Sequence, residues 1–134
     1  MTAVARQNAT QQVHFIRVPV QWNSSGIASG VPIGAVPAGA QIVDVTVRIV
    51  TAFNAATTNV LQVGTTATGG EVLTSAEAAA GSTGFKRGTT GGTVSFASDT
   101  ILYASYTQTG TAASAGSAII CIMYVPNTDI TALP

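Results

Sequence analysis

The stretch GAVPAGAQIVDVTVRIVTAFNA, residues 34–55, decides the fold class of this chain. One face of the run carries every second side chain: Val43, Val45, Val47, Ile49 and Phe53, with Thr51 in the same series. Period-two alternation of β-branched residues is the pattern of a half-buried strand. The Pro-Ala-Gly sequence just before it favours a turn, because proline fixes φ and glycine permits a positive φ. We therefore predict a long strand with this face in the core.

Two charged residues, Asp44 and Arg48, share the opposite face of this strand. At about 3.3 Å per residue they are separated by roughly 13 Å, which is too far for direct pairing. Each is therefore expected to pair with another strand or another subunit.

Other strand-like runs recur between segments rich in Gly, Ser, Asn and Pro: residues 11–22, 59–64, 93–97, 100–107 and 117–125. Pro19 cannot donate a ladder hydrogen bond, so the first run is predicted to be an edge strand or bulged. The last run is apolar on both faces, which predicts a central strand buried on both sides. At least six strands with hardly any helix predict a single-domain all-β fold, either an antiparallel β-sandwich or a barrel.

The segment after residue 73 predicts one short helical turn followed by a loop. Thr74 and Glu77 have the T-x-x-E spacing of a capping box, and Gly81 follows three alanines as a natural C-cap. Residues 81–92, GSTGFKRGTTGG, are too rich in glycine for anything but a loop, and they lack the G-x-x-x-x-G-K-[ST] pattern of a phosphate loop. This loop is either a plain surface loop or a contact site, with Phe85 as an apolar anchor and Lys86 and Arg87 paired with acids on a partner.

Charge is scarce in this chain. Charged residues make up 7% of the sequence, and five basic residues balance five acidic ones, whereas ordinary domains carry about 25% charged residues. The neutral balance gives no electrostatic footprint for nucleic acid. No run approaches the roughly 20 apolar residues that cross a bilayer, and residues 1–12 show no secretory signal. A surface with so little charge favours burial in an assembly.

Residues suited to catalysis or metal binding are too few and too scattered to predict an enzyme. His14 is the only histidine, no G-x-S-x-G elbow is present, and the acids occur singly. The alternative, which we do not favour, is a calcium site built from carbonyls and one or two carboxylates. Cys121, the only cysteine, is expected to be a small buried hydrophobe. We therefore predict no catalytic residues, no cofactor and no metal.

Aromatic residues offer an alternative role in binding. Trp22, Tyr103 and Tyr106 would be the stacking residues if the chain read glycans, although aromatics on strands are more often core or interface.

We divide the chain into an N-terminal arm (1–12), a β-sandwich domain (13–125) and a C-terminal tail (126–134). Both terminal segments are expected to become ordered on a neighbouring molecule. The candidate partner contacts are Arg6, Trp22, Phe85, Lys86, Arg87 and Asp129.

The order of these segments resembles a known class of virion protein. A P-A-G-A turn leads into the alternating strand and AFNA, then a short strand ends in VGT, and ILYASYTQTGTAASAG leads into an apolar last strand. Over residues 34–125 this is similar to small virion proteins of tailed bacteriophages, above all capsid decoration (cement) proteins.

The resemblance implies a jelly-roll β-sandwich that forms homodimers or homotrimers. Such a protein would be made in the bacterial cytoplasm and would bind the capsid exterior, bridging subunits of the major capsid protein and stiffening the shell. The resemblance supplies no catalytic residues. The alternative is a head-fibre or tail accessory protein that binds a receptor or glycan.

Overall fold

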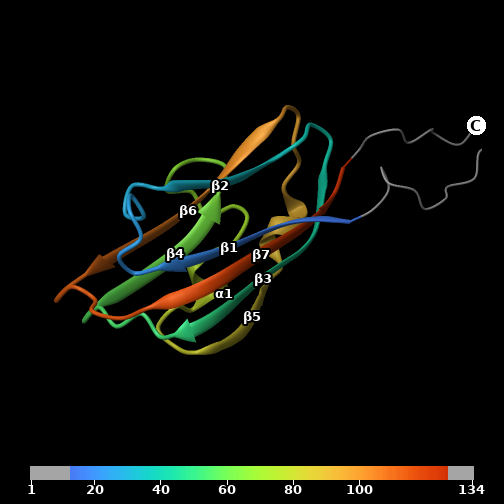
Figure 1. The fold of residues 1–134 in the computed structure, drawn as a ribbon. Coiled ribbons are helices and arrows are strands. Elements are labelled where there is room, and N and C mark those ends of the chain that lie inside the picture. Colours follow the sequence, from blue (N-terminus) through green and yellow to red (C-terminus); the bar gives the residue numbers. More distant parts are fainter. Residues whose placement is uncertain (1–12, 127–134) are drawn as a thin grey trace, which may run out of the picture.

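The computed structural model describes residues 13–126 and folds them into two packed antiparallel sheets (Figure 1). The strands are β1 (His14–Gln21), β2 (Val31–Val36), β3 (Gln41–Thr51), β4 (Thr58–Gly64), β5 (Gly84–Gly88), β6 (Thr100–Thr109) and β7 (Ser117–Val125). Helix α1 (Ser75–Ala78) and the 3-10 turn η1 (Thr90–Thr93) complete the secondary structure. The predicted antiparallel β-sandwich with one short helical turn is confirmed.

Successive strands alternate between the two sheets. The four-stranded sheet has the order β1-β7-β3-β5 and the three-stranded sheet the order β2-β6-β4. Strand β1 therefore pairs with β7, β2 with β6 and β3 with β5, which is the nested pairing of a long hairpin wound into a jelly roll. A single bridge between Val63 and Leu73 lies beside β4, where a jelly roll usually has its eighth strand.

The core lies between the sheets and is built from the inward residues of β3, β7, β4 and β6. The largest side chains in it with almost no exposure are Tyr106, Phe53, Ile49, Leu61, Leu73, Leu102, Ile120 and Ile122. The rings of Phe53 and Tyr106 pack with centroids 4.6 Å apart. The Tyr106 hydroxyl donates to Asn59 Oδ1 at 2.7 Å, so the one polar atom of this ring has a partner.

Two bulges in β3 change the face on which several predicted core residues lie. The register with β7 shifts between Ile42 and Asp44 and again between Ile49 and Thr51. Each bulge inserts one extra residue, so Ile42 turns inward while Val43 turns outward and is 49% exposed. The assignment of Val43 and Thr51 to the core face was wrong for this reason, since Thr51 is exposed too.

The glycine-rich segment 81–92 is not only a loop, because residues 84–88 form the edge strand β5. This strand pairs with β3 from Val45 to Ile49. Its glycines lie only at its two ends, and three non-glycine residues between them are enough for a short edge strand.

The capping box at Thr74 and Glu77 is confirmed, but the helix ends before Gly81. Ala79 is the C-cap, with a left-handed φ of 42°. The helix stops there because Ala80 is drawn into the core, where its carbonyl accepts a hydrogen bond from the Phe53 amide at 2.9 Å.

The strand predicted at residues 93–97 is absent. After η1, this segment crosses from one sheet to the other, with Phe96 buried and its carbonyl accepting from the Gly39 amide at 2.7 Å. Its backbone therefore caps the end of the sandwich and pairs with neither sheet.

The positions of the first and last strands in their sheet agree with the predictions from sequence. Strand β1, which contains Pro19, is an edge strand, and β7 is central in its sheet. However, β7 is buried on its inner face only, and its outer residues Ile119, Cys121 and Met123 are half-exposed. The prediction that Cys121 is buried was wrong, because no second layer of the described chain covers this side of the sheet.

Candidate interaction surface

The side of the four-stranded sheet that points away from the core is not covered by another layer of the described chain, and we call it the outer face. Three rows of side chains cross it from strand to strand: Phe15, Met123 and Asp44; Arg17, Cys121, Thr46 and Arg87; and Pro19, Ile119, Arg48 and Phe85. Period two places these residues on one side, while their neighbours in each strand fill the core. The sheet pairing therefore gathers into one surface residues that lie far apart in the sequence.

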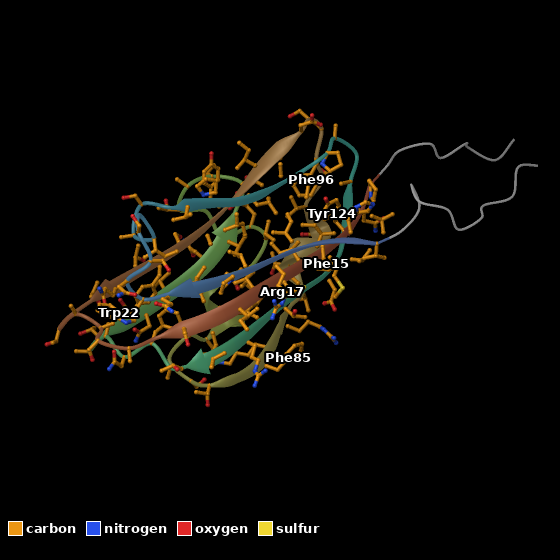
Figure 2. All side chains as sticks on the ribbon, viewed as in Figure 1. Phe15, Arg17, Trp22, Phe85, Phe96 and Tyr124 are labelled. Carbon is orange, nitrogen blue, oxygen red and sulfur yellow. The ribbon has the colours of Figure 1, made fainter. Side chains whose placement is uncertain are left out.

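Much of the outer face is apolar. Phe15 is 65% exposed and Phe85 is 66% exposed, on the two edge strands of the sheet (Figure 2). Val43, turned outward by the first bulge of β3, and Val50 at the second bulge add exposed apolar side chains. The half-buried Met123, Cys121 and Ile119 of β7 lie between the two edge strands, and exposed apolar surface of this kind marks interaction sites in soluble proteins.

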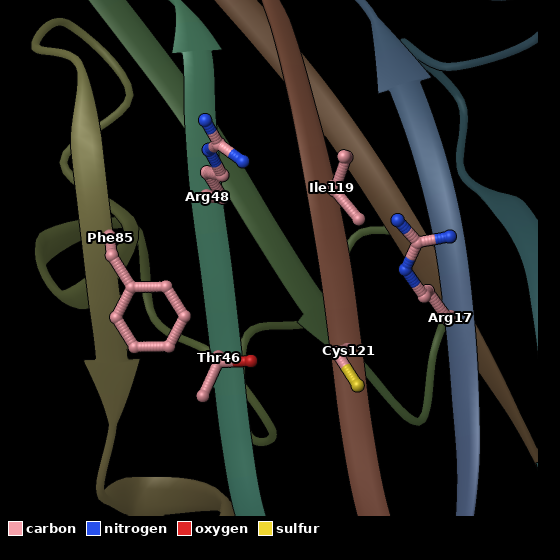
Figure 3. Close-up of a pocket in the computed structure, with 6 residues that line it drawn as sticks. All are labelled: Arg17, Thr46, Arg48, Phe85, Ile119 and Cys121. Carbon is pink, nitrogen blue, oxygen red and sulfur yellow. The ribbon is translucent and has the colours of Figure 1, made fainter.

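A hollow of about 260 Å³ lies in the middle of the outer face (Figure 3). Its lining comes from all four strands of the sheet: Arg17, Thr46, Arg48, Phe85, Ile119 and Cys121. Ile119 and Cys121 lie on β7, between Arg17 on β1 and Arg48 on β3, and Phe85 closes the β5 side. The hollow is thus apolar along its middle and carries a guanidinium on either side of β7.

The charges on the outer face are unevenly balanced. Arg87 Nε pairs with Asp44 Oδ1 at 3.2 Å, which joins β5 to β3 and confirms that Asp44 pairs with another strand. This is the one salt bridge within residues 13–126. Arg17 and Arg48 are exposed and form no ion pair within that range, so the face has two cations without a carboxylate partner.

Strand β5, which presents Phe85 and Arg87, is held from behind by polar contacts with α1 and its flanking loops. Lys86 points away from the outer face, and its Nζ donates to the Ser82 carbonyl at 2.7 Å, to Ser82 Oγ at 2.8 Å and to the Ala79 carbonyl. Desolvation lowers the pKa of Lys86. This side chain thus fixes the strand from inside the chain.

Glu77 makes a second connection behind β5. Its carboxylate accepts from the backbone amides of Thr74 at 3.0 Å and Thr90 at 3.1 Å, and also from the Thr89 amide. Desolvation raises the pKa of Glu77, but the hydrogen bonds from these amides outweigh it and lower the value to about 2. The carboxylate therefore joins the start of α1 to the segment that follows β5.

On the opposite side of the molecule, loops cover part of the three-stranded sheet, around Ser105. The backbones at Gly30, just before β2, and Ala67, after β4, touch across β6, so closely that a Cβ at Gly30 would lie 1.9 Å from the Ala67 carbonyl oxygen. Beneath them Ser105 is 1% exposed, although it points away from the core. The rest of this side is open to solvent, since Pro32, Ala35, Ile101 and Thr107 are exposed.

The predicted contact residues do not all come together. Phe85 and Arg87 lie on the outer face, whereas Trp22 lies past the end of β1 remote from Phe15 and packs against the core (Figure 2). Arg6 and Asp129 fall outside the described residues.

The proposed stacking residues do not form a glycan platform. Tyr106 is buried, and Tyr103 lies on the other side of β6 from it. Of the three, only Trp22 and Tyr103 retain part of their surface.

Sequence reasoning missed Phe15, Arg17, Arg48 and Ile119 as parts of the candidate surface. The available signal was the apolar character of both faces of residues 117–125, since only one face of that strand can enter the core of a two-layer sandwich.

The outer face is therefore a candidate interaction surface built on one sheet of a β-sandwich. No group of three His, Cys, Asp or Glu side chains in that range lies close enough to hold a metal ion. No helix of the described chain has the length and apolarity to cross a membrane.

Solved structures of bacteriophage capsids contain chains with this fold. One chain of the capsid asymmetric unit of cyanophage Pam1 matches with a TM-score of 0.69 and 20% identity, over 92% of this chain and 91% of that one. A chain of the acid-stable capsid of Helicobacter pylori bacteriophage KHP30 matches with a TM-score of 0.62 and 15% identity, over 96% and 95%. A chain of the Ralstonia phage GP4 capsid matches with a TM-score of 0.59 and 16% identity, over 96% and 92%. These matches establish a shared fold over nearly the full length.

No protein-family model matches the sequence, and no curated protein matches it.

Proposed function

We propose that this chain is a bacteriophage capsid decoration (cement) protein that binds the outer surface of the head and stabilises contacts between major capsid subunits. The observation that carries the proposal is the fold shared, end to end, with chains of three phage capsids. In each comparison the matched share of the two chains is nearly equal, so the capsid chains are about as long as this one.

The outer face is the surface proposed to bind the shell. It is broad, partly apolar and built on paired strands, so its backbone needs little ordering when it binds. A single contact of this size is modest, but many copies on one lattice bind a particle together far more strongly than each copy binds alone. The chain would thus act by area and repetition rather than by chemistry.

Self-association completes the proposal. The scarcity of charge, 7% of residues, suits a chain that buries surface against copies of itself, as a homodimer or homotrimer. Residues 1–12 and 126–134 are proposed as the arm and tail that reach neighbouring molecules.

Phage particles from cells that carry the gene test this proposal directly. We expect mass spectrometry to detect the chain in purified particles, and electron microscopy to show its density on the outside of the head. Heads of a phage that lacks the gene should break at a lower temperature than parent heads. Adding the purified protein should restore their stability. Density confined to the tail would contradict the proposal and favour the accessory-protein alternative. Heads without the protein that are as stable as parent heads would also contradict the proposal.

A further inference from the structure

We infer that the outer face binds a protein segment of the capsid shell with a specific chemistry: carboxylate side chains that flank a bulky apolar one. The carboxylates pair with Arg17 and Arg48, and the apolar side chain enters the hollow between them. The inference rests on the proposed function and adds to it the chemistry of the partner.

Unpaired charge is the first argument. Arg17 and Arg48 have no carboxylate partner within residues 13–126, while the nearest acid of the outer face, Asp44, is already paired with Arg87. Burying a guanidinium without a partner is costly, so a partner that covers this face must bring acids to both. Arginine suits this role, because its planar fork pairs with a carboxylate through two parallel hydrogen bonds.

The spacing of the two arginines fits an extended segment. Arg17 and Arg48 lie on strands separated by β7 and in adjacent rows. Strand and row spacings place their Cα atoms roughly 12 Å apart. Acids four positions apart on an extended chain span a similar distance, about 13 Å, and the residue midway between them points to the same side. The apolar residue then falls between the acids, over Ile119 and Cys121.

The hollow supplies the apolar half of the site. Ile119 lies in its middle and Phe85 walls its β5 side, so an inserted side chain replaces water on both. Interfaces gain most of their binding energy from such an anchor in a central pocket with a charged rim. The small positive charge of the outer face argues against a nucleic-acid partner. Two arginines on a neutral chain give little of the charge that phosphate binding needs.

The first test compares two double variants that change the net charge equally. R17Q/R48Q removes two positive charges from the outer face, and T107E/T111E adds two negative charges at exposed positions on and after β6, in the other sheet. Binding is measured on heads prepared without this protein, over a range of salt concentrations. We expect R17Q/R48Q to bind at least about tenfold more weakly than the parent and to lose most of the salt dependence. T107E/T111E should bind like the parent.

The second test uses Cys121 as a reporter of the covered face, since it is the only cysteine and lines the hollow. Alkylation of Cys121 should slow at least tenfold when the protein sits on heads. A cysteine placed by Thr107→Cys in a Cys121→Ser background should stay reactive there.

The two tests separate the inference from the proposed function. Parent-like binding and salt dependence of R17Q/R48Q would overturn the inference, and so would a Cys121 that stays reactive on decorated heads, while the decoration role would stand. Failure of the parent protein itself to bind heads would instead overturn the proposed function.

Discussion

Asp44 on β3 and Arg87 on β5 are joined by an ion pair of 3.2 Å, which crosses the outer edge of the four-stranded sheet. The pair is open to water, with the Arg87 side chain 63% exposed. The one acid of the outer face is therefore already paired. The other two arginines of that face, Arg17 and Arg48, are left for a partner.

Replacing Asp44 by Asn should cost little stability. Because the pair is solvated, we expect the free energy of unfolding to fall by at most about 1 kcal/mol. Denaturant titration measures this, and the difference from the parent should shrink in high salt as the attraction is screened. A loss of more than about 2 kcal/mol would show that the pair does more than hold the edge of the sheet.

Glu77 should make the fold sensitive to acid. Its pKa in the folded chain, about 2, is below the ordinary value of 4.5, so its contribution is present above pH 4.5 and is lost as the pH falls toward 2. At pH 7 we expect Glu77→Gln to lose about 1–2 kcal/mol of unfolding free energy, discounted for partial exposure. The difference between variant and parent should disappear near pH 2. Parallel stability curves from pH 7 to pH 2 would rule out this role.

Most of the fold was predictable because alternation and turn chemistry are local signals. The strand at residues 117–125 and the capping box at Thr74 follow directly from sequence. The two bulges of β3 do not, because Ile42 and Val43 are both apolar and β-branched, so the pattern allows either to face inward. Strand β5 was missed because three residues between glycines carry too little periodicity.

The candidate surface was only half predictable for a different reason. Phe85 and Arg87 lie together in the glycine-rich segment 81–92, so the sequence alone groups them. Arg17 and Arg48 become neighbours only through the strand order β1-β7-β3. That order is set by which faces pack together in three dimensions. A single sequence does not record it.

The hydroxyl of Tyr106 provides a test of the core. It donates to Asn59 Oδ1 at 2.7 Å inside a buried cluster, so Tyr106→Phe should lower the free energy of unfolding by about 1 kcal/mol. Tyr103→Phe is the matched control, because that hydroxyl makes no hydrogen bond within residues 13–126 and its removal should change stability by less than about 0.5 kcal/mol. Equal losses of unfolding free energy in the two variants would show that the hydrogen bond from Tyr106 to Asn59 does not stabilise the core. Thermal and denaturant unfolding give both values.

Gly30 tests whether the loops over the three-stranded sheet are needed for the fold. It has a φ of +95°, and a Cβ there would overlap the Ala67 carbonyl, so Gly30→Ala must push the two loops apart. Strain and displaced contacts together should cost about 2 kcal/mol or more. Gly81→Ala is the control, since nothing lies within 4 Å of its Cβ position, and this change should be neutral or stabilising by about 0.5 kcal/mol. If Gly30→Ala unfolds at the parent's denaturant midpoint, the loop contact contributes nothing to stability. If it instead destabilises the chain as expected, hydrogen exchange should localise the loss to β6 beneath the loops and leave the amides of β7 protected.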